Sequence, residues 1–219
     1  MQIILVDDAS TDKTVNEVTE FVNENDDLNI KILNQPKRVG KSKALNIALK
    51  NADNDIIVMS DADAFWNKNI LREALPYLAD PSVGAVIGRQ KILNPEQSWV
   101  TQGEKKYLRF AFDIIRLGES KIHSTIIFHG LFAAYKRKFL SQFNIETDDS
   151  GTALDIVQKG GRTILVYDAI CFDVSPATWR GKVFTKVRRA SQLVQIWGRC
   201  LRLLVKGQLR LPKKITIPE

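Results

Sequence analysis

The sequence has 219 residues but only two cysteines, and this scarcity excludes both a disulfide-rich fold and a cysteine-based zinc site. Cys171 and Cys200 lie far apart, and neither is part of a Cys-x-x-Cys pair. A disulfide-stabilised fold needs more cysteines, and a structural zinc site needs clustered ligands. We therefore expect a reduced, cytosolic protein whose stability comes from a hydrophobic core.

Long apolar runs are also missing. The sequence contains no uncharged apolar stretch of about 18 residues, so no membrane-spanning helix is expected. No basic leader is present either, because Met1 is followed directly by the apolar run Ile3–Val6, and no signal peptide is expected. With 44% hydrophobic and 26% charged residues and no repeats, the composition is that of an ordinary globular protein.

Acidic residues are nearly absent from the C-terminal segment, residues 178–219. The segment holds 11 of the 32 Lys and Arg residues but only one of the 25 acidic residues, Glu219. Residues 1–177 are therefore close to neutral, and we interpret them as one domain, because no linker rich in Pro, Gly or Ser divides them. Such a basic segment favours phosphate partners, either nucleic acid or an anionic membrane surface.

The basic segment has the pattern of an amphipathic helix from Trp179 to about Lys206. Its apolar side chains recur at steps of three and four residues, at Leu193, Trp197, Leu201 and Leu204. A basic amphipathic helix that contains Trp suits the surface of an anionic bilayer. Packing of the same stripe against the domain is the alternative, and the sequence leaves both open.

Short apolar runs alternate with amphipathic stretches along the rest of the chain. The runs predict strands at residues 3–6, 30–33, 56–59, 83–89 and 163–167, and one within 122–135. Helical spacing predicts helices at residues 15–22, 40–50, 67–78, 97–117 and 149–159. This alternation predicts an α/β fold with a parallel sheet, in which ligands bind at the carboxyl ends of the strands.

Paired carboxylates follow two of these predicted strands. Asp7 and Asp8 follow residues 3–6, and Asp61 and Asp63 follow residues 56–59. A hard cation such as Mg²⁺ or Mn²⁺ commonly takes one or two carboxylates together with substrate phosphates. A single Asp-x-Asp is more often a turn, but two acidic strand ends in one sheet favour a metal–phosphate site.

The segment Val39–Ser42 resembles the end of a phosphate-binding loop of nucleotide hydrolases. That loop starts with a glycine where this chain has Gln35, and Pro36 removes a backbone N–H from it. Lys41 at a helix N-terminus can also meet an anion without such a loop. A P-loop-like NTPase is therefore one alternative function, and a non-catalytic basic module that binds membrane or nucleic acid is another.

Two further positions are candidates for chemistry. Asp148 and Asp149 precede a predicted helix, where a plain N-cap is the simpler explanation. A carboxylate near a metal–phosphate centre can also deprotonate an acceptor hydroxyl. His129 precedes Gly130, a residue that permits close backbone approach, and is a weaker candidate.

Taken together, these segments resemble glycosyltransferase family 2, the inverting nucleotide-sugar transferases with a GT-A fold. The resemblance implies a Rossmann-like, mostly parallel sheet flanked by helices, followed here by the basic amphipathic helix. The matching segments occur in the family's order, and they are Ile3–Asp12 (V-D-D-x-S-x-D), Gly40–Asn46 (G-K-x-x-A-L-N), Ser60–Asp63 (D-x-D), Val83–Arg89 (V-G-x-V-x-G), Gly130–Leu140 and Asp148-Asp149, with Asp148 in place of Glu.

The resemblance implies a metal-assisted, inverting transfer from a UDP- or GDP-linked sugar to an acceptor hydroxyl or a lipid phosphate. Asp149, with Asp148 beside it, would be the general base. Asp61 and Asp63 would serve the sugar diphosphate and its Mg²⁺ or Mn²⁺, and Asp63 would be the direct ligand.

The remaining sites follow from the same resemblance. Asp7 and Asp8 would contact the nucleoside, with Lys41 nearby. Arg188 and Arg189 of the basic segment would meet the diphosphate, and His129 and Gly130 would lie on the acceptor side. The implied acceptor is a glycan or a polyprenyl-phosphate lipid, and the implied place of action is the cytoplasm, at the cytoplasmic face of a membrane. No nucleic-acid partner is expected.

Two departures from the family pattern limit these expectations. The family's first strand, with its P-x-Y-N-E-type loop, does not precede Ile3, so we expect either a chain that starts late or weak donor binding. The Q-x-x-R-W motif of processive members is replaced by Lys186–Ala190, so a processive polymer synthase is not expected.

Overall fold

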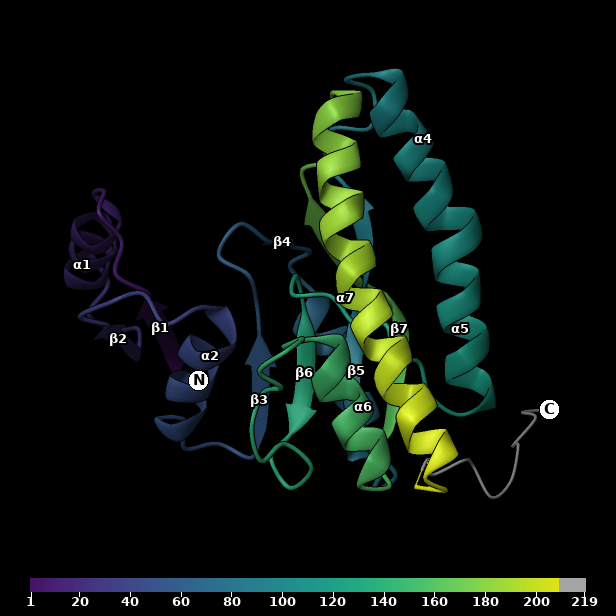
Figure 1. Ribbon diagram of the computed structural model, residues 1–219. Coiled ribbons are helices and arrows are strands. Elements are labelled where there is room, and N and C mark those ends of the chain that lie inside the picture. Colours follow the sequence, from purple (N-terminus) through teal and green to yellow (C-terminus); the bar gives the residue numbers. More distant parts are fainter. Residues whose placement is uncertain (209–219) are drawn as a thin grey trace.

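A computed structural model describes residues 1–208 of the chain. The last part of the basic segment, residues 209–219, lies outside the described residues, as does the side chain of Ala111. The first part of the chain alternates strand and helix as expected (Figure 1). The elements are β1 (Ile3–Asp7), α1 (Thr14–Glu24), β2 (Ile30–Asn34), α2 (Lys41–Lys50) and β3 (Ile56–Met59).

The rest of the chain supplies the other four strands of the larger sheet and the remaining helices. Its elements are β4 (Phe65–Trp66), α3 (Ile70–Ala74) with a 3-10 turn (Leu75–Ala79), β5 (Val83–Ile92), α4 (Trp99–Tyr107), a π-helical turn (Leu108–Phe112), α5 (Asp113–Ile122), β6 (Ala133–Lys136), α6 (Ser150–Gln158), β7 (Arg162–Asp173) and α7 (Trp179–Val205).

The predicted α/β architecture is confirmed, and the differences have local causes. The two-residue strand β4 is too short to give a period-two signal. The helix predicted at 67–78 ends early as α-helix and tightens into a 3-10 turn at Pro76, whose missing N–H cannot donate to the helix. The helix predicted at 97–117 reaches Ile122 through the π-helical turn.

The sheet is mixed and comes in two parts. Five strands pair in the order β3-β6-β5-β7-β4, with β5 and β7 parallel and β6 antiparallel to both β3 and β5. Strands β1 and β2 pair in parallel with each other, but within residues 1–208 neither pairs with the larger sheet. In Figure 1 they stand with α1 and α2 to one side of the main body.

The core lies on both faces of the central strands β5 and β6. Ala85 and Ile87 of β5 pack into one buried cluster, while Val86 between them packs into the other. Ala133 and Tyr135 of β6 face the first cluster with them. Because successive side chains of a strand point to opposite faces, this division shows that both faces of the sheet are covered. Helix α6 contributes Ala153 and Ile156, and α3 contributes Ile70 and Ala74.

Helix α7 crosses one face of this body and is exposed over much of its length (Figure 1). Ile196 is buried against the body, and Lys182 is buried near the start of the helix. Trp197, Leu201 and Leu204, part of the stripe predicted from the sequence, point outward instead. Among the described residues, no helix has both the length and the apolar character needed to cross a bilayer.

Candidate functional site

A cavity of about 610 Å³ opens where the carboxyl end of β3 meets the start of α2, the segment before α6, and α7. It collects all the residues predicted for a site except Asp7 and Asp8. Those that line it are Lys41, Asp61, Asp63, His129, Gly130, Asp148, Asp149, Arg188 and Arg189. The structure therefore brings together residues that are up to 148 positions apart in the sequence.

Lys41 links two of the carboxylates in this cavity. Its Nζ lies 2.7 Å from Asp61 Oδ1 and 2.8 Å from Asp148 Oδ2. Partial burial alone would lower the pKa of Lys41, but the carboxylates of Asp148 and Asp61 outweigh it and raise the pKa above its ordinary value. Lys41 therefore stays charged and holds the end of β3 against the segment before α6.

Gly130 permits the close approach of Asp61. The Asp61 N–H donates to the Gly130 carbonyl over 2.7 Å. A Cβ at position 130 would lie 2.3–2.6 Å from the Asp61 carboxylate, closer than atoms can pack. Because Gly130 has no side chain, the Asp61 carboxylate can occupy this space.

Asp63 supplies a second carboxylate on the same loop. It is exposed, and no hydrogen bond or ion pair involves its side chain within residues 1–208. Asp173 at the end of β7 lines the same cavity, and burial raises its pKa, with Asp63 also acting in that direction. Sequence reasoning missed Asp173, although an acid at a strand's carboxyl end was the signal used to find Asp61.

These side chains fit a divalent cation that a substrate helps to bind. In the described part of the chain no three His, Cys, Asp or Glu side chains form a ready-made metal cage. Mg²⁺, however, is usually held by one or two carboxylates plus substrate phosphates. Asp63, whose side chain has no hydrogen bond or ion pair in the described part of the chain, and Asp61 beside it match that requirement.

Asp149 caps helix α6 and is poised to accept a proton. Its Oδ1 accepts a hydrogen bond from the Ser150 N–H at 2.6 Å. Burial raises the pKa of Asp149, and the neighbouring charge of Asp148 raises it further. A carboxylate with a raised pKa binds a proton more readily than an exposed one, which suits a general base.

Arg116 is a charged residue of this cavity that sequence reasoning missed. It lies on α5, is almost fully buried and lines the cavity. Its Nε and Nη1 have no hydrogen-bond partner within residues 1–208, because the nearby Asp113 is paired with Arg89 at 2.6 Å. Burial lowers the pKa of Arg116 to about 9, although Asp113 acts against this shift. An unpaired buried guanidinium is a ready receptor for an anion.

His129 is neutral in this setting. Burial lowers its pKa well below the ordinary value, and the charge of Arg116 lowers it further. Its Nε2 lies 3.0 Å from the Gly88 carbonyl, which can only accept, so Nε2 carries the proton. The buried Nδ1, which has no partner in the described residues, is then a bare acceptor.

Asp7 and Asp8 lie outside the cavity lining. Asp8 accepts hydrogen bonds from the N–H groups of Val39 at 2.6 Å and Gly40 at 2.8 Å, which ties β1 to the start of α2. Asp7 accepts from the Ser10 N–H at 3.2 Å. The N–H groups that a P-loop would offer to phosphate are thus directed to Asp8, which argues against the NTPase alternative.

The two arginines of α7 differ in their partners. Arg189 Nη2 lies 3.7 Å from Asp173 Oδ2, which also accepts from Gln90 at 3.0 Å. Arg188 is exposed and lines the cavity without an ion pair among residues 1–208. Both are placed to add positive charge to the cavity opposite its aspartates.

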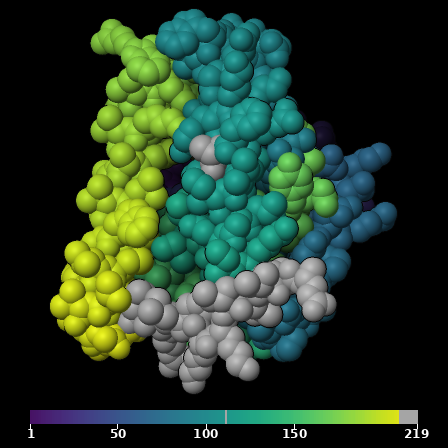
Figure 2. All heavy atoms as spheres, turned by 90° about the vertical axis from the view of Figure 1, so that its right-hand side faces the viewer, coloured from purple at the N-terminus to yellow at the C-terminus, as the bar shows by residue number. Residues whose placement is uncertain are grey.

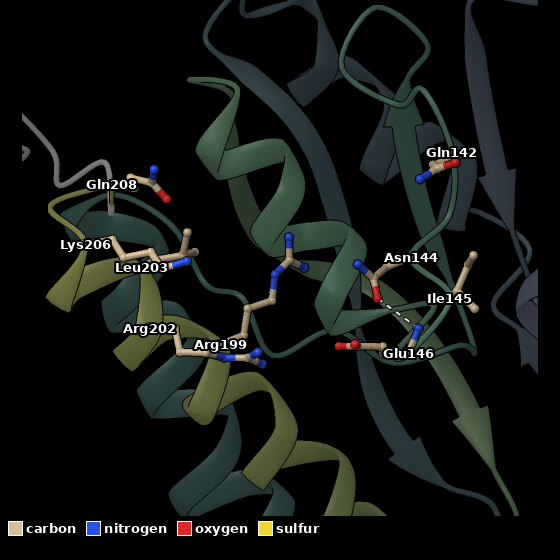
Figure 3. A pocket seen from close by; sticks show the side chains of 9 residues that line it. All are labelled: Gln142, Asn144, Ile145, Glu146, Arg199, Arg202, Leu203, Lys206 and Gln208. Atoms are coloured by element: carbon tan, nitrogen blue, oxygen red, sulfur yellow. Dashed lines mark hydrogen bonds between the residues drawn. The ribbon is translucent and has the colours of Figure 1, made fainter.

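A second hollow of about 400 Å³ lies at the other end of α7, between Arg199, Lys206 and the segment around Glu146 (Figure 3). The Arg199 guanidinium there is paired with Asp155. The hollow contains none of the residues predicted for the site, so it is not the candidate active site.

Comparisons with known proteins agree on one family. Residues 1–143 match the family described as Glycosyl transferase family 2. A beta-monoglucosyldiacylglycerol synthase of Synechocystis is 34% identical over 47% of this chain and 22% of its own length. An N-acetylglucosaminyltransferase of Rhizobium is 24% identical over 79% of this chain and 44% of its own length. The chain thus spans less than half the length of these curated relatives.

Solved structures give the same result for the fold. The mannosyltransferase PcManGT from Pyrobaculum calidifontis, in complex with GDP-Man and Mn²⁺, is 36% identical, with a TM-score of 0.79 over 92% of this chain and 55% of that one. TarS of Staphylococcus aureus, in complex with UDP-GlcNAc, is 17% identical with a TM-score of 0.58, over 82% of this chain and 51% of that one, and shows the fold alone.

Proposed function

This chain belongs to glycosyl transferase family 2, and we propose on that basis that it transfers a sugar from a nucleotide-diphosphate donor to an acceptor with inversion at the anomeric carbon. The observation that carries the proposal is the single cavity in which Lys41, Asp63 and Asp149 meet. The expected donor is UDP- or GDP-linked, in keeping with the donors named for the structural relatives.

The donor end of the proposed reaction uses the acidic loop after β3. Asp63, with Asp61 beside it, would hold Mg²⁺ or Mn²⁺ together with the donor diphosphate. A bound divalent ion would stabilise the negative charge of the departing nucleoside diphosphate. Arg188 and Arg189 would add positive charge to the same group, and Asp7 and Asp8 would lie toward the nucleoside.

The acceptor end uses the segment before α6. Asp149 would take the proton of an acceptor hydroxyl while the oxygen attacks the anomeric carbon from the face opposite the leaving diphosphate. Asp148, paired with Lys41, would hold Asp149 in place, and His129 and Gly130 would border the acceptor. We propose that this reaction takes place at the cytoplasmic face of a membrane, with the exposed side of α7 toward the membrane.

Nucleotide binding tests the proposal without requiring the acceptor. Titration with UDP and with GDP, each with and without Mn²⁺, should show binding of at least one nucleotide that Mn²⁺ strengthens. Asp63→Ala should remove about tenfold or more of that Mn²⁺-dependent strengthening. Asp168→Ala, an exposed aspartate on β7 outside the cavity, is the matched control and should bind as the unaltered chain does. Binding of neither nucleotide in the presence of Mn²⁺ would refute the proposal.

A further inference from the structure

A groove of about 580 Å³ runs between α4 and α7, beside the catalytic cavity. Its lining is almost entirely apolar or aromatic at the outer end, where Trp99 and Trp179 stack with their ring centroids 5.8 Å apart. Val183 and Val187 of α7 continue the lining inward. Figure 2 views the face on which α7 and the α4–α5 stretch stand as two adjacent columns.

The groove leads into the catalytic cavity. The two hollows share four lining residues, Glu104, Tyr107, Lys186 and Ala190. At this junction the Glu104 carboxylate lies 2.8 Å from Lys182 Nζ and 3.3 Å from Lys186 Nζ. The ammonium of Lys186 also lies over the Tyr107 ring, 3.9 Å from its centroid. The groove is therefore apolar at its outer end and charged where it meets the cavity.

The helices that form this face bury several charged side chains and expose several large apolar ones. Helix α5 buries Asp113 and Arg116 but exposes Ile114 and Ile115, which are 61% and 54% exposed. An amphipathic helix in water normally does the reverse.

The neighbouring helical stretches repeat this reversal. Helix α4 buries Glu104, while Phe110 of the π-helical turn is 63% exposed. Helix α7 buries Lys182 and exposes Phe184, Val194 and Trp197. Exposed apolar side chains on three neighbouring helical stretches favour an apolar partner.

We propose that the acceptor is a lipid whose hydrocarbon chain lies in the α4–α7 groove, with its head group in the catalytic cavity. This inference rests on the proposed glycosyl transfer. Continuity of the groove with the cavity favours a single molecule that occupies both. Exposed cations near the groove, Lys105 and Lys106 on α4 and Arg180 and Arg188 on α7, suit the anionic surface from which such a lipid would come.

The proposed transfer needs no residues beyond those already described. An oxygen of the lipid head group forms the new bond to the anomeric carbon, and the bond from that carbon to the donor diphosphate breaks. The nucleoside diphosphate leaves with the electron pair of the broken bond. Where the head group is a hydroxyl, its proton passes to Asp149. Where it is a phosphate, the attacking oxygen is already ionised and no proton moves.

The first experiment measures dependence on chain length. The full chain is assayed with GDP-mannose and with UDP-N-acetylglucosamine in Mn²⁺, against dioleoylglycerol, dibutyrylglycerol, farnesyl phosphate and isopentenyl phosphate. Each buried methylene contributes about fourfold to binding. Burial of only about three or four additional methylenes in the groove should therefore raise kcat/KM for the long-chain acceptor about 100-fold over its short-chain counterpart. Transfer to the acylglycerols identifies the head group as a hydroxyl, and transfer to the prenyl phosphates identifies it as a phosphate.

The second experiment blocks the groove. A Cβ at Gly103, which lines the groove on α4, would meet nothing within 4 Å, so the backbone there accepts a side chain and Gly103→Trp places an indole in the groove. Gly118 on α5 is equally open and lines neither hollow, so Gly118→Trp is the matched control. Gly103→Trp should lower kcat/KM for the long-chain acceptor about tenfold or more and leave the short-chain value unchanged. Gly118→Trp should change neither.

The outcomes separate this inference from the proposed function. Transfer that is indifferent to chain length, or to Gly103→Trp, would overturn the lipid assignment while leaving glycosyl transfer intact. If Gly103→Trp weakens binding to phosphatidylglycerol vesicles but not the chain-length preference, the groove anchors the protein rather than the acceptor, and the inference is wrong. Mn²⁺-dependent nucleotide binding, retained in both Trp variants, shows that the donor site is intact.

Discussion

Replacement of Gly130 by alanine should displace Asp61 and slow transfer with little cost to folding. The new Cβ would lie 2.3 Å from Asp61 Oδ2 and 2.5 Å from Oδ1, whereas ordinary contacts begin at about 3.4 Å. The carboxylate must therefore retreat by about 1 Å. That movement also disturbs the 2.7 Å contact of Asp61 with Lys41.

The size of the effect follows from this displacement. A misplacement of about 1 Å costs about 100-fold in rate, which corresponds to about 2.7 kcal/mol in the barrier. Asp61 lies at a strand end and is only half-buried, so its side chain can move outward. We therefore expect the lower end of the usual overpacking cost, about 1 kcal/mol in the free energy of unfolding.

The assay is kcat/KM for sugar transfer, read beside the melting temperature and the Mn²⁺ dependence of nucleotide binding. Gly118→Ala is the control, because its Cβ meets nothing within 4 Å. An alanine inside helix α5 should stabilise the chain by about 0.5–1 kcal/mol and leave transfer unchanged. If Gly130→Ala transfers within threefold of the unaltered chain, or if both variants lose activity equally, the reasoning about Asp61 is refuted.

Two further substitutions should separate stability from activity. Asp149→Asn should lower kcat about 10²–10⁴-fold. It should also raise the melting temperature at neutral pH, because burial raises the pKa of Asp149 and its charge therefore opposes folding once the pH exceeds that pKa. In the unaltered chain kcat/KM should fall as the pH drops through this raised pKa, and an acid limb at about pH 4 would contradict the assignment. Arg116→Met should raise the free energy of unfolding at neutral pH by about 1–3 kcal/mol, since it removes a buried charge whose Nε and Nη1 have no hydrogen-bond partner within residues 1–208. The same change should lower transfer about tenfold or more if the guanidinium binds an anionic group, and loss of stability in this variant would contradict the reasoning.

Local patterns in the sequence were sufficient for the acidic strand ends and for the helix starts. Asp61 and Asp63 directly follow an apolar run, and Lys41 directly follows a glycine that starts a helix, so neighbouring residues reveal both. Asp149 is the N-cap of α6, as the simpler explanation of this residue predicted, and it also lines the cavity. The two explanations of this residue were therefore not exclusive.

Asp173 was missed because the strand predicted at 163–167 stops short of the true end of β7. Arg116 could not be found from local patterns, because its surroundings are set by tertiary packing. On a helix with Ile114 and Ile115, a charged residue is expected to face water. Here the charged side is buried and the isoleucines are exposed, and no spacing rule indicates which side of a helix faces the body. The outward direction of Trp197 and Leu201 escaped prediction for the same reason.

The division of the sheet into two parts predicts which part of the molecule unfolds locally first. The unit formed by β1, β2, α1 and α2 shares no strand pairing with the larger sheet, within residues 1–208. Its polar links to the body include the bonds between Asn46 and the Phe143 backbone, and the contacts of Lys41. Because Leu49 of α2 packs in the core cluster of the body, we expect only β1, β2 and α1 to form an element of low local stability. Amide protons of β1 and β2 should therefore exchange with solvent well before those of β5 and β6. A donor that bridges Lys41 and Asp63 would slow that exchange. Donor binding would in this way stabilise the folded state of the N-terminal end of the chain.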